Sequence, residues 1–288
     1  MKMINKKLKF YWIMIKPFQT GLLLLTGVTG FISSRCLVIN FGKFSGLILS
    51  LLLTIGGSTV LNMVFDRDID LKMLRTMRRP IPSGKIRAKE AFLIGIIMCI
   101  IGLILAFSLS FLYGILIFAG ILFDVFVYTI WLKRKTSWSI FWGGISGAMP
   151  ILAGRTLGIG YIDTIGIMFA LSILLWIPTH IMTFNMLYFN DYKKAGIPTF
   201  PSKYGFKNTR VVIALSSVGA SIAIGIGITA LGLSWGYLRL LAILSAGLFG
   251  LAIMSVLKPS EKINFGLFKY ASLYMLIAML MTAIGSVS

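Results

Sequence analysis

The sequence feature that most limits the fold of this chain is a series of long apolar runs separated by short polar stretches. Most of these runs are about 20 residues long, enough to cross a bilayer as a helix. Nine of them lie at about 12–37, 44–65, 90–109, 111–132, 138–157, 163–187, 209–231, 236–256 and 267–287. Charged residues make up 12% of the chain, whereas a soluble domain averages about 25%. We therefore predict an all-α, polytopic protein of the lipid bilayer, folded as one transmembrane domain over residues 1–288.

The basic residues indicate how such a chain is oriented. With nine spans and the N-terminus in the cytoplasm, 23 of the 28 lysines and arginines fall on the cytoplasmic side, in segments 2–9, 67–89, 133–135, 193–210 and 258–269. Cytoplasmic loops carry such an excess of positive charge, so we predict a multi-pass protein of the cell membrane with a cytoplasmic N-terminus. The net charge of +20 does not indicate a nucleic-acid partner, because it is divided among short loops between apolar runs.

Residues that commonly bind transition metals are scarce in this chain. Cys36 and Cys99 lie in or beside apolar runs without CxxC spacing, and His180 is the single histidine. We therefore expect no disulfide framework, no zinc site built from the protein and no bis-histidine haem site within one chain.

A first cluster of polar residues follows the second apolar run. Asn62, Asp66 and Asp70 are spaced four residues apart, so on a helix they share one face, while Asp68 points elsewhere. Carboxylate and amide oxygens are hard ligands that suit Mg²⁺, which prefers one or two carboxylates together with substrate phosphates. The stripe therefore predicts a magnesium site that a phosphate ligand completes.

Five basic residues come directly after this stripe: Lys72, Arg75, Arg78, Arg79 and Lys85. Arginine matches the oxygens of a phosphate group, so stripe and basic cluster together indicate a metal–diphosphate site. The alternative is a solvated charged loop that obeys the positive-inside rule. That alternative explains the arginines, but it explains poorly why Asn62 and Asp66 abut a membrane span, where acids are costly.

A second cluster follows the sixth apolar run, on the same predicted side of the membrane. It contains His180 and, further on, Asn190 and Asp191, which are able to complete a metal shell from the opposite wall. A lone histidine near a helix end is more often a packed or capping residue than a ligand, so spacing alone leaves the role of His180 open. A glycine-rich stretch at 143–148 is typical of close packing between membrane helices.

Several stretches of the sequence resemble the UbiA superfamily of intramembrane prenyltransferases. The spacing Asn62-x₃-Asp66-x₃-Asp70 resembles the first diphosphate–metal motif of that superfamily. Further stretches resemble its haem O synthase branch: Arg75-Thr76, Arg79-Pro80 and Pro82-Ser83-Gly84, Lys16-Pro17, Tyr128-Thr129 with Lys133-Arg134, Pro178-x-His180, and Tyr188-x₂-Asp191-Tyr192. The resemblance covers roughly residues 10–205.

This resemblance implies nine helices around a central cavity, with the active site on the cytoplasmic side. It implies that Mg²⁺, bound by Asn62, Asp66, Asp70 and Asp191, holds an isoprenyl diphosphate, with Asp66, Asp70 and Asp191 as the catalytic acids. The diphosphate-binding residues would be Lys16, Arg75, Arg79, Lys133, Arg134 and Lys194. His180, Tyr188 and Tyr128 would contact the acceptor, which in the haem branch is a vinyl group of haem B. A terminal oxidase or haem A synthase would be the membrane partner that uses the product.

Three other functions compete with this interpretation. A relative within the superfamily would prenylate a quinone precursor or a lipid alcohol, and departures from the haem pattern near His180, such as Ile181-Met182, keep that alternative open. A multi-span transporter would place its acids near the bilayer midplane, whereas Asp66 and Asp70 lie at one face. A non-enzymatic assembly factor for an oxidase would tolerate the loss of either aspartate.

Overall fold

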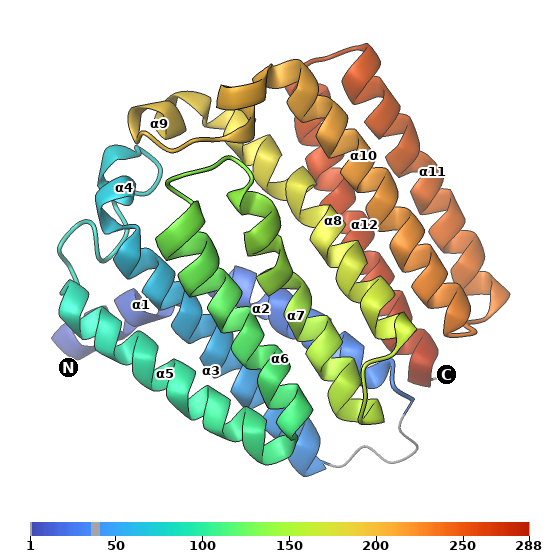
Figure 1. Cartoon of the computed structure of the whole chain (residues 1–288), viewed down its shortest axis with the longest axis horizontal. Helices are drawn as coiled ribbons and strands as arrows, with labels where there is room; N and C mark the ends of the chain where they lie inside the picture. The colour runs from blue at the N-terminus through green and yellow to red at the C-terminus, as the bar shows by residue number, and fades with distance from the viewer. Residues whose placement is uncertain (1, 36–40, 288) are drawn as a thin grey trace.

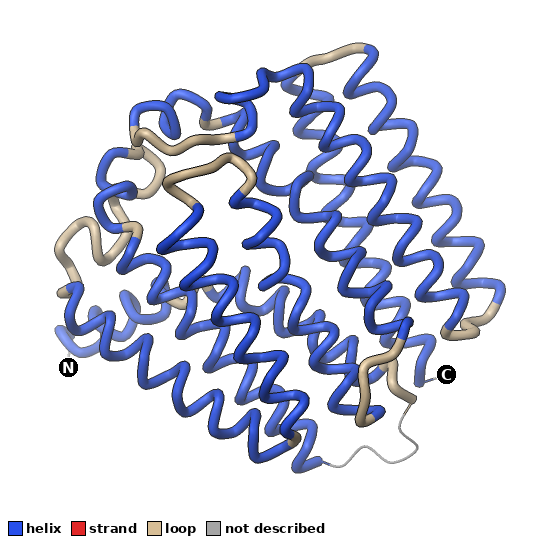
Figure 2. The backbone as a smooth tube through the Cα atoms, viewed as in Figure 1, coloured by secondary structure: helices blue, strands red, loops and turns tan. Residues whose placement is uncertain are grey.

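The computed structural model describes residues 2–35 and 41–287, with side chains described from Lys7 onward. Helices joined by loops make up this part of the chain, and no β-strand occurs in it (Figure 2). The elements are α1 (Lys2–Met14), α2 (Pro17–Ile32), α3 (Phe41–Phe65), α4 (Arg67–Lys72), α5 (Ala88–Leu109), α6 (Phe111–Ile121), η1 (Leu122–Leu132), α7 (Ser139–Ile159), α8 (Thr164–Leu187), α9 (Phe189–Lys194), α10 (Phe200–Ala230), α11 (Trp235–Leu257) and α12 (Glu261–Val287).

The all-helical membrane architecture is confirmed. Seven helices of the described chain are long and apolar enough to cross a bilayer, and eight are if the bent pair α1–α2 counts as one span. The second to ninth predicted segments each fall on helical structure, but α7, which covers the fifth segment, is not among those seven or eight. The count of nine and the cytoplasmic position of the N-terminus remain predictions.

The first predicted segment, 12–37, is not one continuous helix, and this prediction was wrong. The chain breaks at Lys16, whose φ of 46° and ψ of 68° are left-handed, and α2 begins at Pro17 with its axis bent by 48° from that of α1. Proline disfavours a right-handed helical conformation in the residue before it, which explains the position of the break. Cys36 and the end of the predicted segment lie outside the described residues.

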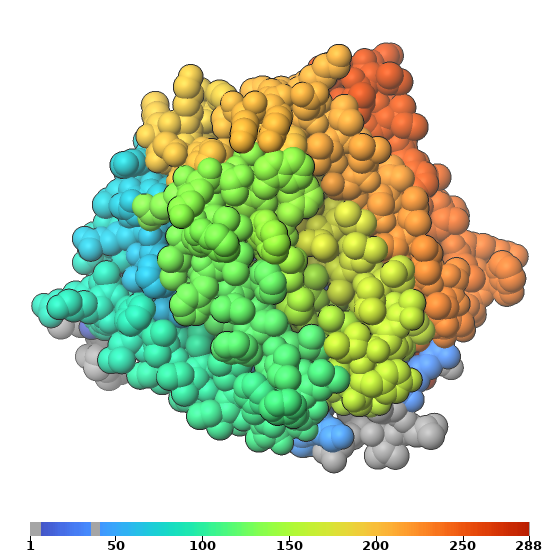
Figure 3. Space-filling view, viewed as in Figure 1, coloured from blue at the N-terminus to red at the C-terminus, as the bar shows by residue number. Residues whose placement is uncertain are grey.

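The two largest of the five apolar clusters in the described residues share α7. This helix lies between the helices of the first half of the chain and α8 to α12 (Figure 1). Ala153 and Leu157 of α7 pack with α2, α3, α5 and α6, whereas Ile140 and Ile151 of the same helix pack with α8, α10, α11 and α12. In the space-filling view, α6 and α7 lie at the centre of one face between α5 and α8 (Figure 3). Large apolar side chains on α5 point outward, as expected for a lipid-facing helix: Phe92, Leu93, Ile97, Ile100 and Ile104.

Glycines allow α2 and α7 to cross in close contact. A Cβ atom added at Gly154 would lie 1.9 Å from the carbonyl oxygen of Gly27, and one added at Gly30 would lie 2.1 Å from that of Ile151. No other residue fits there without moving a helix backbone. The packing role predicted for stretch 143–148 is also confirmed, since a Cβ at Gly147 would clash with Ile177 of α8 at 2.7 Å.

Candidate functional site

A cavity of about 610 Å³ lies among the helices, and its wall is polar at one end and apolar along the rest. Helices α2, α3, α4, α6, η1, α7, α8 and α12 all contribute to the wall. The charged and hydrogen-bonding residues that line it include Lys16, Asn62, Asp66, Asp70, Arg75, Arg79, Asp124, Tyr128, Lys133, His180 and Tyr192. A cavity of this size and character suits an extended apolar ligand with a charged head.

The polar stripe predicted from the sequence is confirmed as one face of the chain. Asn62 is in the last turn of α3, Asp66 connects α3 to α4, and Asp70 is in α4. The amide of Asp66 donates to the carbonyl of Asn62 at 2.9 Å, and the amide of Asp70 donates to that of Asp66 at 2.8 Å. The helical repeat therefore continues across the junction, so all three side chains face the cavity. Asp66 is 2% exposed and Asp70 is 4% exposed.

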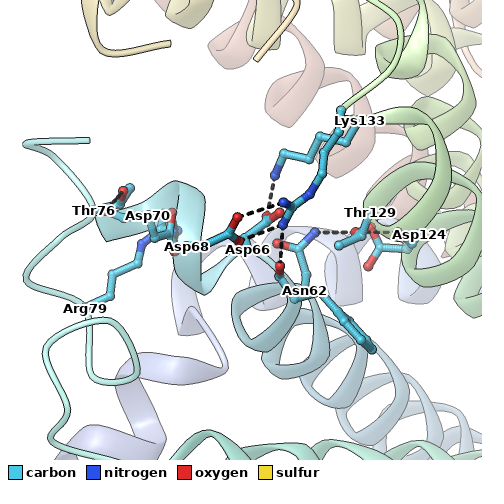
Figure 4. Close-up of polar contacts among 11 residues, drawn as sticks. Asn62, Asp66, Asp68, Asp70, Thr76, Arg79, Asp124, Thr129 and Lys133 are labelled. Atoms are coloured by element: carbon cyan, nitrogen blue, oxygen red, sulfur yellow. Dashed lines mark hydrogen bonds and ion pairs between the residues drawn. The ribbon is translucent and has the colours of Figure 1, made fainter. Parts of the chain in front are cut away.

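Each of these two carboxylates already contacts a cation (Figure 4). Lys133 donates to Oδ2 of Asp66, and Nη1 of Arg79 donates to both carboxylate oxygens of Asp70, at 3.0 and 2.8 Å. Burial opposes the charge of Lys133, but its neighbours Tyr128 and Asp66 raise its pKa above the ordinary value. The polar end of the cavity therefore holds acids and bases in charged pairs.

The donor set at this end fits a metal ion that also binds a substrate. Oδ1 of Asp66 is buried, and no residue that the structure describes hydrogen-bonds to it. Asn62 directs its Nδ2 to the hydroxyl of Thr129 at 2.7 Å, so its Oδ1 is the atom available to a metal. No group of three His, Cys, Asp or Glu side chains is gathered as a cage in the described residues. The stripe offers hard oxygen donors, which Mg²⁺ prefers together with phosphate and water.

Several predicted site residues do not reach the cavity wall. Asp191 is half-buried on α9, and although α9 packs near α4, it is the next residue, Tyr192, that lines the cavity. Lys194 is exposed. The guanidinium carbon of Arg75 lies 5.2 Å from the ring centroid of Tyr188.

Arg134 also lies outside the cavity. It donates to both oxygens of Asp68, at 2.7 Å each, and to the carbonyl of Phe65. These hydrogen bonds from Arg134 hold the pKa of the Asp68 carboxyl below its usual range. As expected, Asp68 points away from the stripe.

His180 stands in the cavity wall among aromatic rings. The ring centroids of Trp176 and Phe268 are each 5.0 Å from that of His180, and that of Phe184 is 5.3 Å away. Its Nδ1 has no hydrogen-bond partner in the described part of the chain. The histidine is therefore packed, as the simplest reading of a lone histidine expects, yet it also faces the space that a ligand would occupy.

Sequence reasoning did not single out Asp124, and it noted Thr129 within a resembling stretch without giving it a role; both lie in the π-helical segment η1. Thr129 accepts from Asn62 and donates to the carbonyl oxygen of Asp124 at 2.7 Å. The amide of Lys133 donates to the carbonyl of Tyr128 five residues earlier, as in a π-helix. The available signal was an acid inside an apolar run, which is costly in a membrane without a function.

Comparisons with known proteins agree with this geometry. Residues 23–280 match the model of the UbiA prenyltransferase family. A protoheme IX farnesyltransferase from Pyrobaculum islandicum is 36% identical over 260 residues, which cover 90% of this chain and 92% of that protein. The corresponding protein from Korarchaeum cryptofilum is 38% identical over 215 residues, covering 74% and 71%.

Solved structures share the fold. A structure concerned with digeranylgeranylglyceryl phosphate synthase has a TM-score of 0.82 at 23% identity and covers 98% of this chain and 99% of its own. A UbiA homolog from Archaeoglobus fulgidus, bound to GPP and Mg²⁺, has a TM-score of 0.68 at 15% identity and covers 95% and 99%.

Proposed function

This chain belongs to the UbiA prenyltransferase family, and on that premise we propose that it transfers a farnesyl or longer polyprenyl group from an isoprenyl diphosphate to a vinyl group of protohaem IX. The product is haem O, for use by a terminal oxidase or haem A synthase. The reaction takes place on the cytoplasmic side of the cell membrane. Prenyl transfer by an integral membrane enzyme follows from the family. The haem acceptor, the membrane side and the partners are the proposal.

One observation carries this function: acids and cations gather at one end of a cavity whose remaining wall is mainly apolar. The charged end suits a diphosphate with its metal, and the apolar length suits a prenyl chain. Such a cavity also excludes water, which would capture the allylic cation before the acceptor reacts. A transporter has no evident need for a charged end of this composition.

The stripe is where a magnesium ion would bind. Asn62, Asp66 and Asp70 are its proposed protein ligands, with Asp191 as a further one if α9 moves toward the cavity when substrate binds. When bound, Mg²⁺ would neutralise the diphosphate as a leaving group. Asp66, Asp70 and Asp191 are accordingly the proposed catalytic acids.

The basic residues of the wall would stabilise the negative charge of the diphosphate. Lys133 and Arg79 contact carboxylates here, and a bound diphosphate would share them, so that positive charge faces the oxygens on which negative charge develops. Lys16 and Arg75 line the same end of the cavity. Arg134 and Lys194 lie farther out and serve at the cavity mouth as the substrate enters.

The acceptor side is formed by the aromatic group around His180. Trp176 and Phe268 flank the imidazole, and flat rings of this kind stack on a porphyrin. The unpartnered Nδ1 of His180 gives the site a polar atom that can orient haem. Tyr128 lines the cavity and is a further proposed acceptor contact. Tyr188 lies outside the lining, against Arg75, and would contact the acceptor only if this end of α8 moves toward the cavity.

The test is a turnover assay with purified protein in detergent, Mg²⁺, haem B and farnesyl or geranylgeranyl diphosphate. Mass spectrometry of the extracted haem should show the addition of one prenyl group and one water. Diphosphate release with unaltered haem, together with prenylation of a quinone precursor or lipid alcohol, would reassign the acceptor. His180→Ala should weaken haem binding more than prenyl diphosphate binding, and equal haem affinity in the variant would remove His180 from the site.

A further inference from the structure

Asp124 is a carboxylate inside a membrane span that the mechanism above does not use. It lies in the span Phe111–Leu132, nine residues before Lys133, which places it on the order of 10 Å deeper along the helix. A carboxylate at such a depth is costly unless it faces a polar cavity or has a partner. Asp124 does face the cavity, so its position calls for a functional explanation.

The surroundings of Asp124 set it apart from the other two acids of the cavity wall. Asp66 and Asp70 each form a direct ion pair, but among the described side chains Asp124 forms none. Ser58 of α3, Lys16 and Lys133 line the same cavity as Asp124. The carboxylate of Asp124 thus faces the cavity without a direct cationic partner among the described side chains.

The backbone around Asp124 is also fixed to the polar stripe. Its carbonyl oxygen accepts from Thr129, whose hydroxyl accepts from Asn62 (Figure 4). This short chain of hydrogen bonds fixes the depth of Asp124 below the stripe. A group bound at the stripe by its diphosphate would therefore extend its first carbons toward the level of this carboxylate.

Every acceptor considered for this enzyme releases one proton in each turnover. The bond between the allylic carbon and the diphosphate oxygen breaks, and its electron pair leaves with the diphosphate. An electron pair of the acceptor then forms the new bond to that carbon. Afterwards an aromatic ring loses its hydrogen, an alcohol loses its hydroxyl proton, or a water that adds to the haem vinyl cation loses one of its own. That proton needs an acceptor, which is either the departing diphosphate or a base in the cavity wall.

We propose that Asp124 is this base: its carboxylate accepts the proton that the acceptor, or the water added to it, releases when the new bond forms. This inference rests on the proposed prenyl transfer, but it is independent of which acceptor is used. Asp66 and Asp70 are engaged by Lys133 and Arg79 at the diphosphate end. His180 and Tyr128 are the other titratable groups proposed on the acceptor side, and the histidine lies among the rings of Trp176, Phe184 and Phe268.

The experiment compares Asp124→Asn and Asp124→Ala with the wild type, using Glu261→Gln as the control for loss of an acid. Glu261 is exposed at the start of α12, far from the cavity lining. General-base catalysis contributes about 100- to 10,000-fold, so Asp124→Asn should lower the turnover number at least 100-fold. Binding of a non-reactive prenyl thiolodiphosphate should stay within about twofold of wild type. Formate, a small carboxylate that fits the space left by Asp124→Ala, should restore activity to that variant and not to the wild type.

Three results would overturn the assignment of Asp124. They are near-wild-type turnover in Asp124→Asn, a loss of turnover matched by an equal loss of thiolodiphosphate binding, and a loss that formate does not restore in Asp124→Ala. A wild-type protein that releases no diphosphate with haem, a quinone precursor or a lipid alcohol would instead refute the proposed function itself. The two failures are thus distinguished by the wild-type assay alone.

Discussion

The contact between Asp66 and Lys133 allows stability and activity to be separated by experiment. The side chain of Asp66 is 3% exposed and that of Lys133 is 16% exposed, so this is a buried ion pair. Removing one partner of such a pair costs about 3–5 kcal/mol, because the other charge is left uncompensated. In Asp66→Asn the ammonium group of Lys133 still faces the cavity. We therefore expect the lower end of this range, about 3 kcal/mol. Lys133→Met should cost at least as much, since Oδ1 of Asp66 already lacks a partner among the described residues.

The double variant Asp66→Asn/Lys133→Met should recover much of that stability without recovering activity. Replacing both charges leaves no buried unpaired ion, and such replacements are often neutral or stabilising. Activity should not recover in the double variant, because both side chains are proposed to act on the diphosphate. Losing one preorganised electrostatic group costs about 100- to 1,000-fold in turnover, so the single and double variants should all be severely impaired.

The assay pairs unfolding in mixed micelles, followed by circular dichroism, with the mass-spectrometric measurement of turnover. Asp68→Asn is the matched control for stability, because its ion pair with Arg134 is exposed, at 58% and 43%, and should change stability by less than about 1 kcal/mol. Normal turnover in any of the three variants would refute the metal–diphosphate assignment of this pair. Strictly additive losses of stability in the double variant would show that the two charges do not stabilise each other.

Three further predictions follow from other parts of the structure. Arg155→Leu should lower the free energy of unfolding by about 3–5 kcal/mol in the same unfolding assay, because this buried arginine donates to both oxygens of Asp163 and to the carbonyl of Ser33. Gly154→Ala should cost about 1–3 kcal/mol by overpacking, since the new Cβ would meet the carbonyl of Gly27 at 1.9 Å; an unchanged unfolding midpoint would contradict this. EDTA should abolish turnover and added Mg²⁺ should restore it, whereas turnover in excess EDTA would exclude a divalent metal from the reaction.

The stripe of the site was predictable from the sequence because it depends on local geometry alone. Asn62, Asp66 and Asp70 share a face whenever the chain keeps a helical repeat, and it does so across the end of α3. The apolar runs likewise predict helices, since a helix satisfies all of its own backbone hydrogen bonds in lipid. Lys133, by contrast, is 67 residues from Asp66, and sequence motifs suggested a shared function for the two residues without showing that they touch.

Other features depend on tertiary packing and were not predictable in that way. Arg155 lies inside the fifth apolar run, outside the segments predicted to be cytoplasmic, and its pairing with Asp163 and Ser33 depends on how α2, α7 and α8 meet. Asp191 lies close in sequence to Tyr192, yet only the tyrosine lines the cavity, because a six-residue helix presents its side chains in different directions. Motif spacing fixes which residues are neighbours in the chain, and the docking of the short helix decides which of them faces the cavity.

Two irregular points of the backbone lie at the same cavity, and membrane physics explains why. In lipid, a backbone group without a hydrogen-bond partner is costly, so departures from the α-helix are tolerated where protein or a polar cavity surrounds them. The left-handed Lys16 and the π-helical segment η1 both border the cavity wall. The first places the side chain of Lys16 in the cavity wall, which Arg79 and Lys133 also line, and the second carries Asp124 and Thr129. A strictly regular bundle of the same apolar runs would turn these side chains to other faces, so the breaks are what bring charge into the membrane interior at the place where the proposed reaction needs it.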